Sequence, residues 1–164
     1  MSKHTVPVQA LGLLGWLALA FATAALGAVA SIEARSFYAQ LVRPEWSPPG
    51  SIFAPVWSVL YALMGLSAWL VWRENGARRR ALALALFVVQ LAANALWSWL
   101  FFAWHKGAWA FVDVLFLLAL IAAMIGAFWS VRCLAALLML PYLGWVGFAS
   151  LLTWAVWQGN PGLL

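Results

Sequence analysis

The chain has 164 residues, of which 67% are hydrophobic and only 8% are charged. A soluble domain of this length cannot bury so much apolar surface, so a mean hydropathy of +0.97 predicts a membrane protein of one domain. The net charge of +5 has no long basic tail behind it, which excludes a nucleic-acid-binding arm, and the single Cys133 excludes an internal disulfide.

The first apolar segment covers about residues 8–30 and contains no charged side chain. At a rise of ~1.5 Å per residue, it is long enough to cross a hydrocarbon core of ~30 Å. A cleaved signal peptide is the alternative, because Lys3 precedes the segment and Ala28-Val29-Ala30 resembles a cleavage site. The segment is long for a signal sequence, so a retained helix is favoured.

Residues 31–52 are polar and rich in proline, and we expect them to form a stiff surface loop. Pro44, Pro48 and Pro49 cannot sit inside a continuing helix, because each lacks an N–H and disfavours α geometry in the residue before it. Pro55 falls near the start of the next apolar run, where a missing N–H costs little. The 31–52 segment is therefore predicted to be a lid that closes one end of a helix bundle.

Four further apolar helices are expected after this loop, at about 53–72, 81–104, 108–131 and 134–157. These runs are about twice as long as the strands of a membrane β-barrel and lack their alternation. The connecting turns are short, so sequence neighbours should be antiparallel. The predicted fold class is an all-α membrane protein, a five-transmembrane-helix up-down bundle that makes a single domain over residues 1–164.

Positive side chains are unevenly divided between the two ends of this bundle. One end carries six: Lys3, Arg73, Arg78, Arg79, Arg80 and Arg132. The other end carries three: Arg35, Arg43 and Lys106. By the positive-inside rule, the N-terminus and the arginine-rich turn face the cytoplasm, and the 31–52 segment and the C-terminus face outward.

The third helix has a polar and aromatic face, because Gln90, Asn94, Trp97 and Phe101 are spaced four, three and four apart. An unpaired amide in lipid is costly, so this face must look into the protein. Two interpretations stay open for the amides. They make interhelical hydrogen bonds, typically worth under ~1 kcal/mol, or they are polar contacts for a bound ligand.

Three other helices each offer a face that includes one tryptophan. The members are Trp57, Tyr61 and Met64, then Trp109, Asp113 and Phe116, then Trp145, Ala149 and Leu152. Asp113 is the only acid inside an apolar run, and a structural pairing role competes with a ligand contact. Some of the 13 tryptophans belong in interfacial belts. Four such faces together predict an aromatic-lined cavity for a large planar or polycyclic apolar ligand.

Enzyme chemistry is not indicated by any motif. The sequence has no Ser-His-Asp set, no paired carboxylates, no metal-ligand spacing and no phosphate loop. We therefore expect no catalytic residue, no metal site and no obligatory cofactor. His105, at a helix end, is interpreted as an interfacial residue.

Five motifs resemble the translocator protein family, also called tryptophan-rich sensory proteins or peripheral-type benzodiazepine receptors. They read RPEWSPPGSIFAPVWSVLYALMG, QLAANALWSWLFF, WAFVD, PYLGWVGFASLL and VWQGN. The resemblance implies a five-helix fold, usually a homodimer, whose cavity opens toward the loop between the first two helices. It also implies binding of porphyrins such as protoporphyrin IX and haem, with a role in tetrapyrrole handling or stress response. For a bacterial member, the cytoplasmic membrane is favoured and the outer membrane is the alternative.

The resemblance also implies which positions bind the ligand. They are Trp46, Phe53, Trp57, Asn94, Trp97, Trp109, Phe116, Trp145, Ala149 and Leu152, to which the helical faces add Tyr61 and Asp113. Some bacterial members are linked to light-dependent porphyrin breakdown, an alternative function in which Trp57 and Trp145 would take part.

Two departures from the family pattern change what is expected. Leu152 is followed by Trp154 and Gln158, so the cation of the cholesterol-recognition pattern is missing and cholesterol is not predicted as the native ligand. The paired prolines usual after Trp97 are replaced by Ser98-Trp99, which predicts a straighter third helix.

Overall fold

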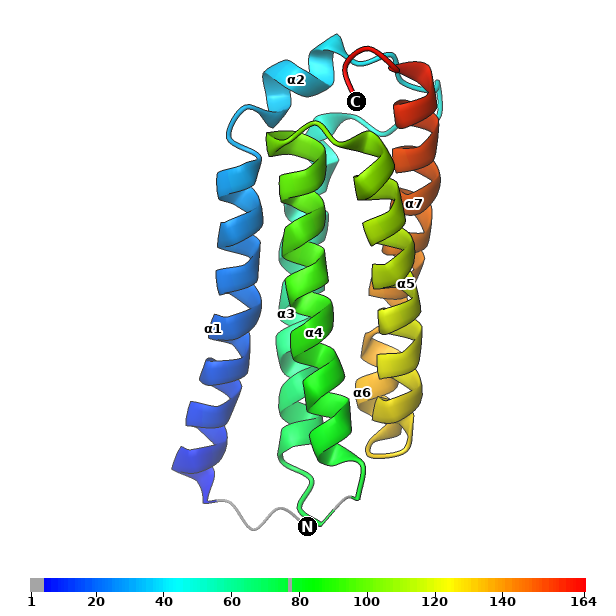
Figure 1. The fold of residues 1–164 in the computed structure, drawn as a ribbon. Coiled ribbons are helices and arrows are strands. Elements are labelled where there is room, and N and C mark those ends of the chain that lie inside the picture. The colour runs from blue at the N-terminus through cyan, green and yellow to red at the C-terminus, as the bar shows by residue number, and fades with distance from the viewer. Residues whose placement is uncertain (1–4, 77) are drawn as a thin grey trace.

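The computed structural model describes residues 5–76 and 78–164, and its regular structure over these ranges is entirely helical. Five helical spans are long and apolar enough to cross a membrane. They are Val6–Ala30, Gly50–Trp72, Arg80–Ala103, Gly107–Trp129 and Cys133–Gly159. Figure 1 shows the spans running alternately up and down the bundle, which confirms the predicted fold class. The chain is an integral, multi-pass membrane protein.

The first span is α1 (Val6–Ala30), and the second is α3 (Phe53–Trp72), which follows a short 3-10 turn, η1 (Gly50–Ile52). These two helices pack closely. A Cβ added at Gly65 of α3 would lie 2.9 Å from the backbone Cα of Leu17. Glycine at this position therefore lets the two backbones approach more closely than any side chain would allow.

The segment expected to be an irregular loop contains a helix, α2 (Ala34–Gln40). Its prolines start only at Pro44, so nothing prevents helix formation upstream of them. Phe37 is the buried side chain of α2 and stacks on His105 at 4.1 Å between ring centroids. The helix thus lies across the end of the bundle, as Figure 1 shows, instead of looping freely above it.

The third span changes its helical form near its end. The α-helix α4 (Arg80–Ser98) continues as a π-helix, η2 (Trp99–Ala103). The sequence predicted a straighter third helix from the absence of the paired prolines, and this change of helical form was not part of that prediction. A π-helix has a wider turn than an α-helix and often occurs at functional sites.

The last span is broken into α6 (Cys133–Leu138) and α7 (Leu140–Gly159), whereas a single helix was expected. The interruption at Met139 comes just before Pro141, which lies in the first turn of α7. Proline lacks the N–H that a continuous helix needs, and its ring collides with the carbonyl four residues earlier. This break leaves α6 packed against α3 and α5, and α7 packed mainly against α5 (Gly107–Trp129).

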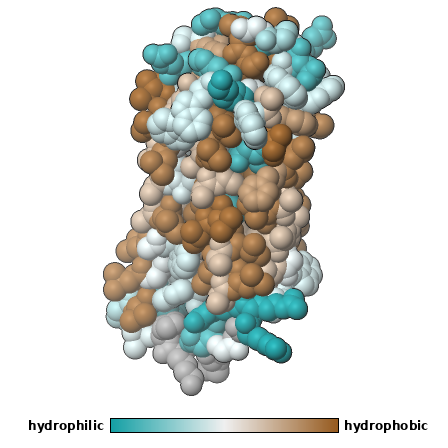
Figure 2. All heavy atoms as spheres, in the orientation of Figure 1, coloured by the Kyte–Doolittle hydropathy of each residue, from teal (hydrophilic) through white to brown (hydrophobic). Residues whose placement is uncertain are grey.

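Charge and hydropathy follow the expected membrane pattern. Figure 2 shows a largely apolar middle with hydrophilic residues gathered at both ends. At one end, Arg132 pairs with Glu74 at 3.0 Å and joins two turns of the bundle. Lys3, which the sequence assigns to the same end, lies outside the described residues.

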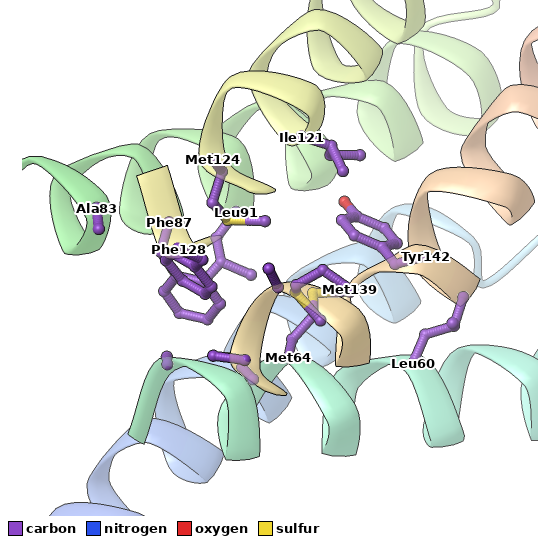
Figure 3. Packing of buried hydrophobic residues seen from close by; sticks show 14 of the residues in the cluster. Leu60, Met64, Ala83, Phe87, Leu91, Ile121, Met124, Phe128, Met139 and Tyr142 are labelled. Atoms are coloured by element: carbon purple, nitrogen blue, oxygen red, sulfur yellow. The ribbon is translucent and has the colours of Figure 1, made fainter. Parts of the chain in front are cut away.

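The main core is built where α3, α4, α5, α6 and the start of α7 meet. Figure 3 shows its side chains, which point into one space from these helices. Phe87 and Phe128 stack at 6.4 Å, and Met64, Ile121 and Met124 fill the centre without exposure. A second cluster lies under α2 and includes Phe37, Phe101 and Leu152.

Candidate functional site

A chain of hydrogen bonds crosses the centre of the bundle. The Tyr61 hydroxyl of α3 donates to the Asn94 amide oxygen of α4. The Asn94 amide nitrogen donates to the Tyr142 hydroxyl of α7 at 3.1 Å, and that hydroxyl donates to the Gln90 amide oxygen at 2.9 Å. Gln90 in turn donates to the sulfur of Met64 at 3.9 Å. Both amides therefore make the interhelical hydrogen bonds that were one of the two interpretations open for them.

Beside this network lies a small space that we call the inner hollow. Its lining comes from four helices: Trp57, Asn94, Trp97, Val114, Leu117, Val146 and Ala149. Its volume is about 10 Å³, which is room for about one water molecule. Four of the predicted binding residues, Trp57, Asn94, Trp97 and Ala149, thus converge on one point, but the space among them is very small.

One donor at the inner hollow has no hydrogen-bond partner in the part of the chain that the structure describes. The indole nitrogen of Trp97 is buried and makes no hydrogen bond to the described residues. The Trp97 ring is held by Phe101, which stacks on it at 5.3 Å, and by the edge contact of Phe102 at 5.7 Å. A buried N–H normally has a partner, and leaving it unpaired costs about 1–3 kcal/mol. This indole is therefore available to a ligand that carries an acceptor.

Aromatic rings close the boundary between α3 and α7. Phe53 meets Trp145 edge to face at 5.8 Å, and Trp57 meets Tyr142 in the same way at 6.2 Å. We call these four residues the aromatic seam. The backbone of α3 packs mainly against α1 and that of α7 mainly against α5, so side chains rather than backbones seal this boundary.

An open groove lies on the other side of the aromatic seam, and we call it the outer groove. It has a volume of about 540 Å³ and an almost entirely apolar lining. The lining residues are Pro55, Val56, Val59, Leu60, Pro141, Gly144, Trp145 and Phe148. Trp145, predicted to share a cavity with Trp57, therefore faces this groove, while Trp57 faces the inner hollow.

The 31–52 segment is held against the end of the bundle where α7 ends. The Trp46 ring lies edge to face on Phe148 at 5.9 Å, although half of its surface is exposed. The Asn160 side chain accepts from the Val42 amide at 2.8 Å and donates to the Val42 carbonyl at 2.9 Å. Asn160 also donates to the Val156 carbonyl at 2.7 Å, so it joins the segment to the end of α7.

Replacing Asn160 by alanine is expected to free the 31–52 segment from α7. The substitution removes both hydrogen bonds to Val42, a loss of about 1–3 kcal/mol in local stability. The amide of Val42 should then exchange its hydrogen at least about tenfold faster. Hydrogen exchange with mass spectrometry measures this, and the exposed neighbour Gln158→Ala is the control. Equal exchange in both variants would contradict the role given to Asn160.

Two predicted site residues on α5 do not join the others. Trp109 is 66% exposed and Phe116 is 55% exposed, whereas Asp113 is 8% exposed. At about 100° per residue, Trp109 and Phe116 lie to one side of Asp113, and the buried Val114 and Leu117 lie to its other side. The spacing correctly placed these three residues near one another on the helix. The face of α5 that points into the bundle, however, runs through Val114 and Leu117 and leaves Trp109 and Phe116 outside it.

Asp113 has one buried carboxyl oxygen without a hydrogen-bond partner among the described residues. The remaining predicted residues make contacts within the bundle. Tyr61 is buried in the hydrogen-bond chain, and Leu152 belongs to the cluster beneath α2. Phe53 lies between Tyr38 and Trp145, with ring centroids 6.0 Å and 5.8 Å away.

Sequence reasoning left Tyr142 out of the candidate site. It is fully buried, bonds to both amides of α4 and contacts Trp57. Its spacing was a usable signal, because Tyr142 lies three residues before Trp145 and seven before Ala149, on the same face of the helix.

The chain is similar to translocator and tryptophan-rich proteins from animals and bacteria. The chain is 41% identical to the translocator protein of Ovis aries over 132 residues, which is 79% of this chain and 78% of that protein. It is 38% identical to the protein CrtK of Rhodobacter capsulatus over 146 residues, 86% of this chain and 89% of that one. It is 37% identical to the tryptophan-rich protein TspO of Chlorobaculum tepidum over 129 residues, 76% and 80% of the two chains.

The TspO/MBR family model matches residues 16–158, which include every span from the middle of α1 to the end of α7. The matched range contains the inner hollow, the aromatic seam and the outer groove. This match and the similar proteins support a membrane translocator or sensory role. The chain therefore belongs to the TspO/MBR family.

Proposed function

We propose that this protein binds porphyrins such as protoporphyrin IX or haem, together with related apolar polycyclic molecules, and that binding regulates the handling of tetrapyrroles. The observation that carries the proposal is the convergence of Trp57, Asn94, Trp97 and Ala149, from three helices, on one point inside the membrane-spanning bundle. Flat aromatic ligands are held well by rings at their faces and a few polar groups at their edges.

The polar groups at this point suit such a ligand. The free Trp97 indole N–H can donate to a ring substituent or carboxylate, and Asn94 can exchange its tyrosine partners for the ligand. The inner hollow has to widen before a porphyrin fits, since its volume is about 10 Å³. Ligands often stabilise such a minor, open state of a pocket.

The test is titration of the purified protein with protoporphyrin IX, followed by the porphyrin's own absorbance and fluorescence. The Trp57→Ala/Trp97→Ala double variant removes two rings that line the inner hollow. Each ring is worth about 0.5–1.5 kcal/mol beyond the area that it buries, so affinity should fall about tenfold or more. The control is Trp154→Ala, which removes an exposed indole of α7 that lines neither space. Equal affinities in the double variant and the control would remove the proposed site.

A further inference from the structure

We propose that the outer groove is the entrance through which a flat apolar ligand passes from the bilayer to the inner hollow, with the aromatic seam as the gate. This inference rests on the proposed function, because it concerns the route of the same ligand. It assigns a role to a surface groove that the binding proposal does not use.

The outer groove has the size and chemistry of a ligand site. Its volume of about 540 Å³ falls within the range of roughly 300–1,000 Å³ typical of small-molecule sites. Its walls are aliphatic, aromatic and proline side chains from the membrane-spanning helices α3 and α7. Apolar molecules dissolved in the hydrocarbon core reach this surface without crossing water.

Residues adjacent in the sequence line the groove and the inner hollow. On α3, Val56 lines the groove and its neighbour Trp57 lines the hollow. On α7, Trp145 lines the groove and its neighbour Val146 lines the hollow. The rings of Trp57 and Trp145 therefore lie on the two sides of this boundary, and in the proposed route their rotation joins the two spaces.

Opening the aromatic seam does not require α3 or α7 to lose its main packing against another helix. The α3 and α7 backbones each pack mainly against another helix, and ring edges rather than interlocked backbones hold the boundary. Gly144 adds no side chain to the groove wall: a Cβ built there meets nothing within 4 Å. At the end of the bundle, two hydrogen bonds between Asn160 and Val42 hold the 31–52 segment against α7.

Filling the groove provides the experiment. Gly144→Trp adds an indole at a position that lines the groove and not the inner hollow, and Val59→Trp adds one from the opposite wall. Gly126→Trp is the matched control, since Gly126 on α5 also has open space around its Cβ and lies outside the groove. Each protein, reconstituted in phosphatidylcholine nanodiscs, is mixed with protoporphyrin IX in a stopped-flow fluorimeter.

The groove-filling variants should bind and release the porphyrin at least about tenfold more slowly than the control, with an unchanged dissociation constant, because an obstructed entrance slows both directions equally. Association as fast as in Gly126→Trp would overturn the entrance. A weakened dissociation constant would also overturn it, since the groove would then be the binding site. Failure of the unaltered protein to bind protoporphyrin IX would instead contradict the proposed function.

Discussion

Replacing Gly65 by leucine is expected to destabilise the bundle more than any other single substitution considered for this protein. A Cβ at this position would lie 2.7 Å from the Leu17 side chain and 2.9 Å from its Cα. The second contact is with backbone, so a rotamer change cannot relieve it, and α1 has to move away from α3. Overpacking of this kind costs about 1–3 kcal/mol and sometimes more.

The measurement is the apparent unfolding midpoint of the purified protein in detergent, followed by circular dichroism. Gly126→Leu is the control, because a side chain at Gly126 meets nothing within 4 Å. We expect the midpoint of Gly65→Leu to fall clearly below those of the control and the unaltered protein. A Gly65→Leu midpoint equal to that of the control would mean that α1 and α3 do not pack as closely as described.

The second large effect is expected at Tyr142. Its hydroxyl accepts from Asn94 and donates to Gln90, and both amides are almost completely buried. Tyr142→Phe leaves an amide nitrogen and an amide oxygen without this partner, and an unsatisfied buried group costs about 1–3 kcal/mol. Measured hydrogen bonds between membrane helices are weaker, about 0.6 kcal/mol on average, so the lower half of that range is expected.

A double-mutant cycle separates this effect from simple loss of packing. Gln90→Leu in the Tyr142→Phe background removes both partners of the 2.9 Å bond, and the second substitution should then cost much less than it does alone. Tyr38→Phe is the control for loss of a hydroxyl, since the hydrogen bond between Tyr38 and Ser47 is only partly buried. Strictly additive costs would show that Tyr142 and Gln90 do not act as a unit.

Much of the fold is visible in the sequence because the membrane imposes simple rules. Apolar runs of this length can only be spans, and short turns make neighbouring spans antiparallel. The break before Pro141 follows from the same proline rule that we applied to the 31–52 segment. The helix α2 was less accessible, because its seven residues carry a single buried side chain, Phe37, and short helices depend on such tertiary contacts.

The candidate site was predictable where polar residues marked the inward face. Asn94 cannot face lipid, so Trp97 one turn later had to face inward too, and the structure places both at the inner hollow. On α5, the marker Asp113 lies at the edge of the buried face, so the direction in which Trp109 points could not be read from spacing. Trp57 lines the inner hollow and Trp145 lines the outer groove. This difference depends on how far apart the other helices hold α3 and α7, and the residue spacing within one helix does not contain that information.

The bond between Val42 and Asn160 has a consequence for the biogenesis of the protein. It joins positions 118 residues apart, and Asn160 comes near the end of the chain. Because a polypeptide is made from its N-terminus, the first four spans are synthesised before this partner exists. During insertion the 31–52 segment therefore lacks its hydrogen bonds to Asn160, and a nascent chain released before residue 160 would enter the membrane without them.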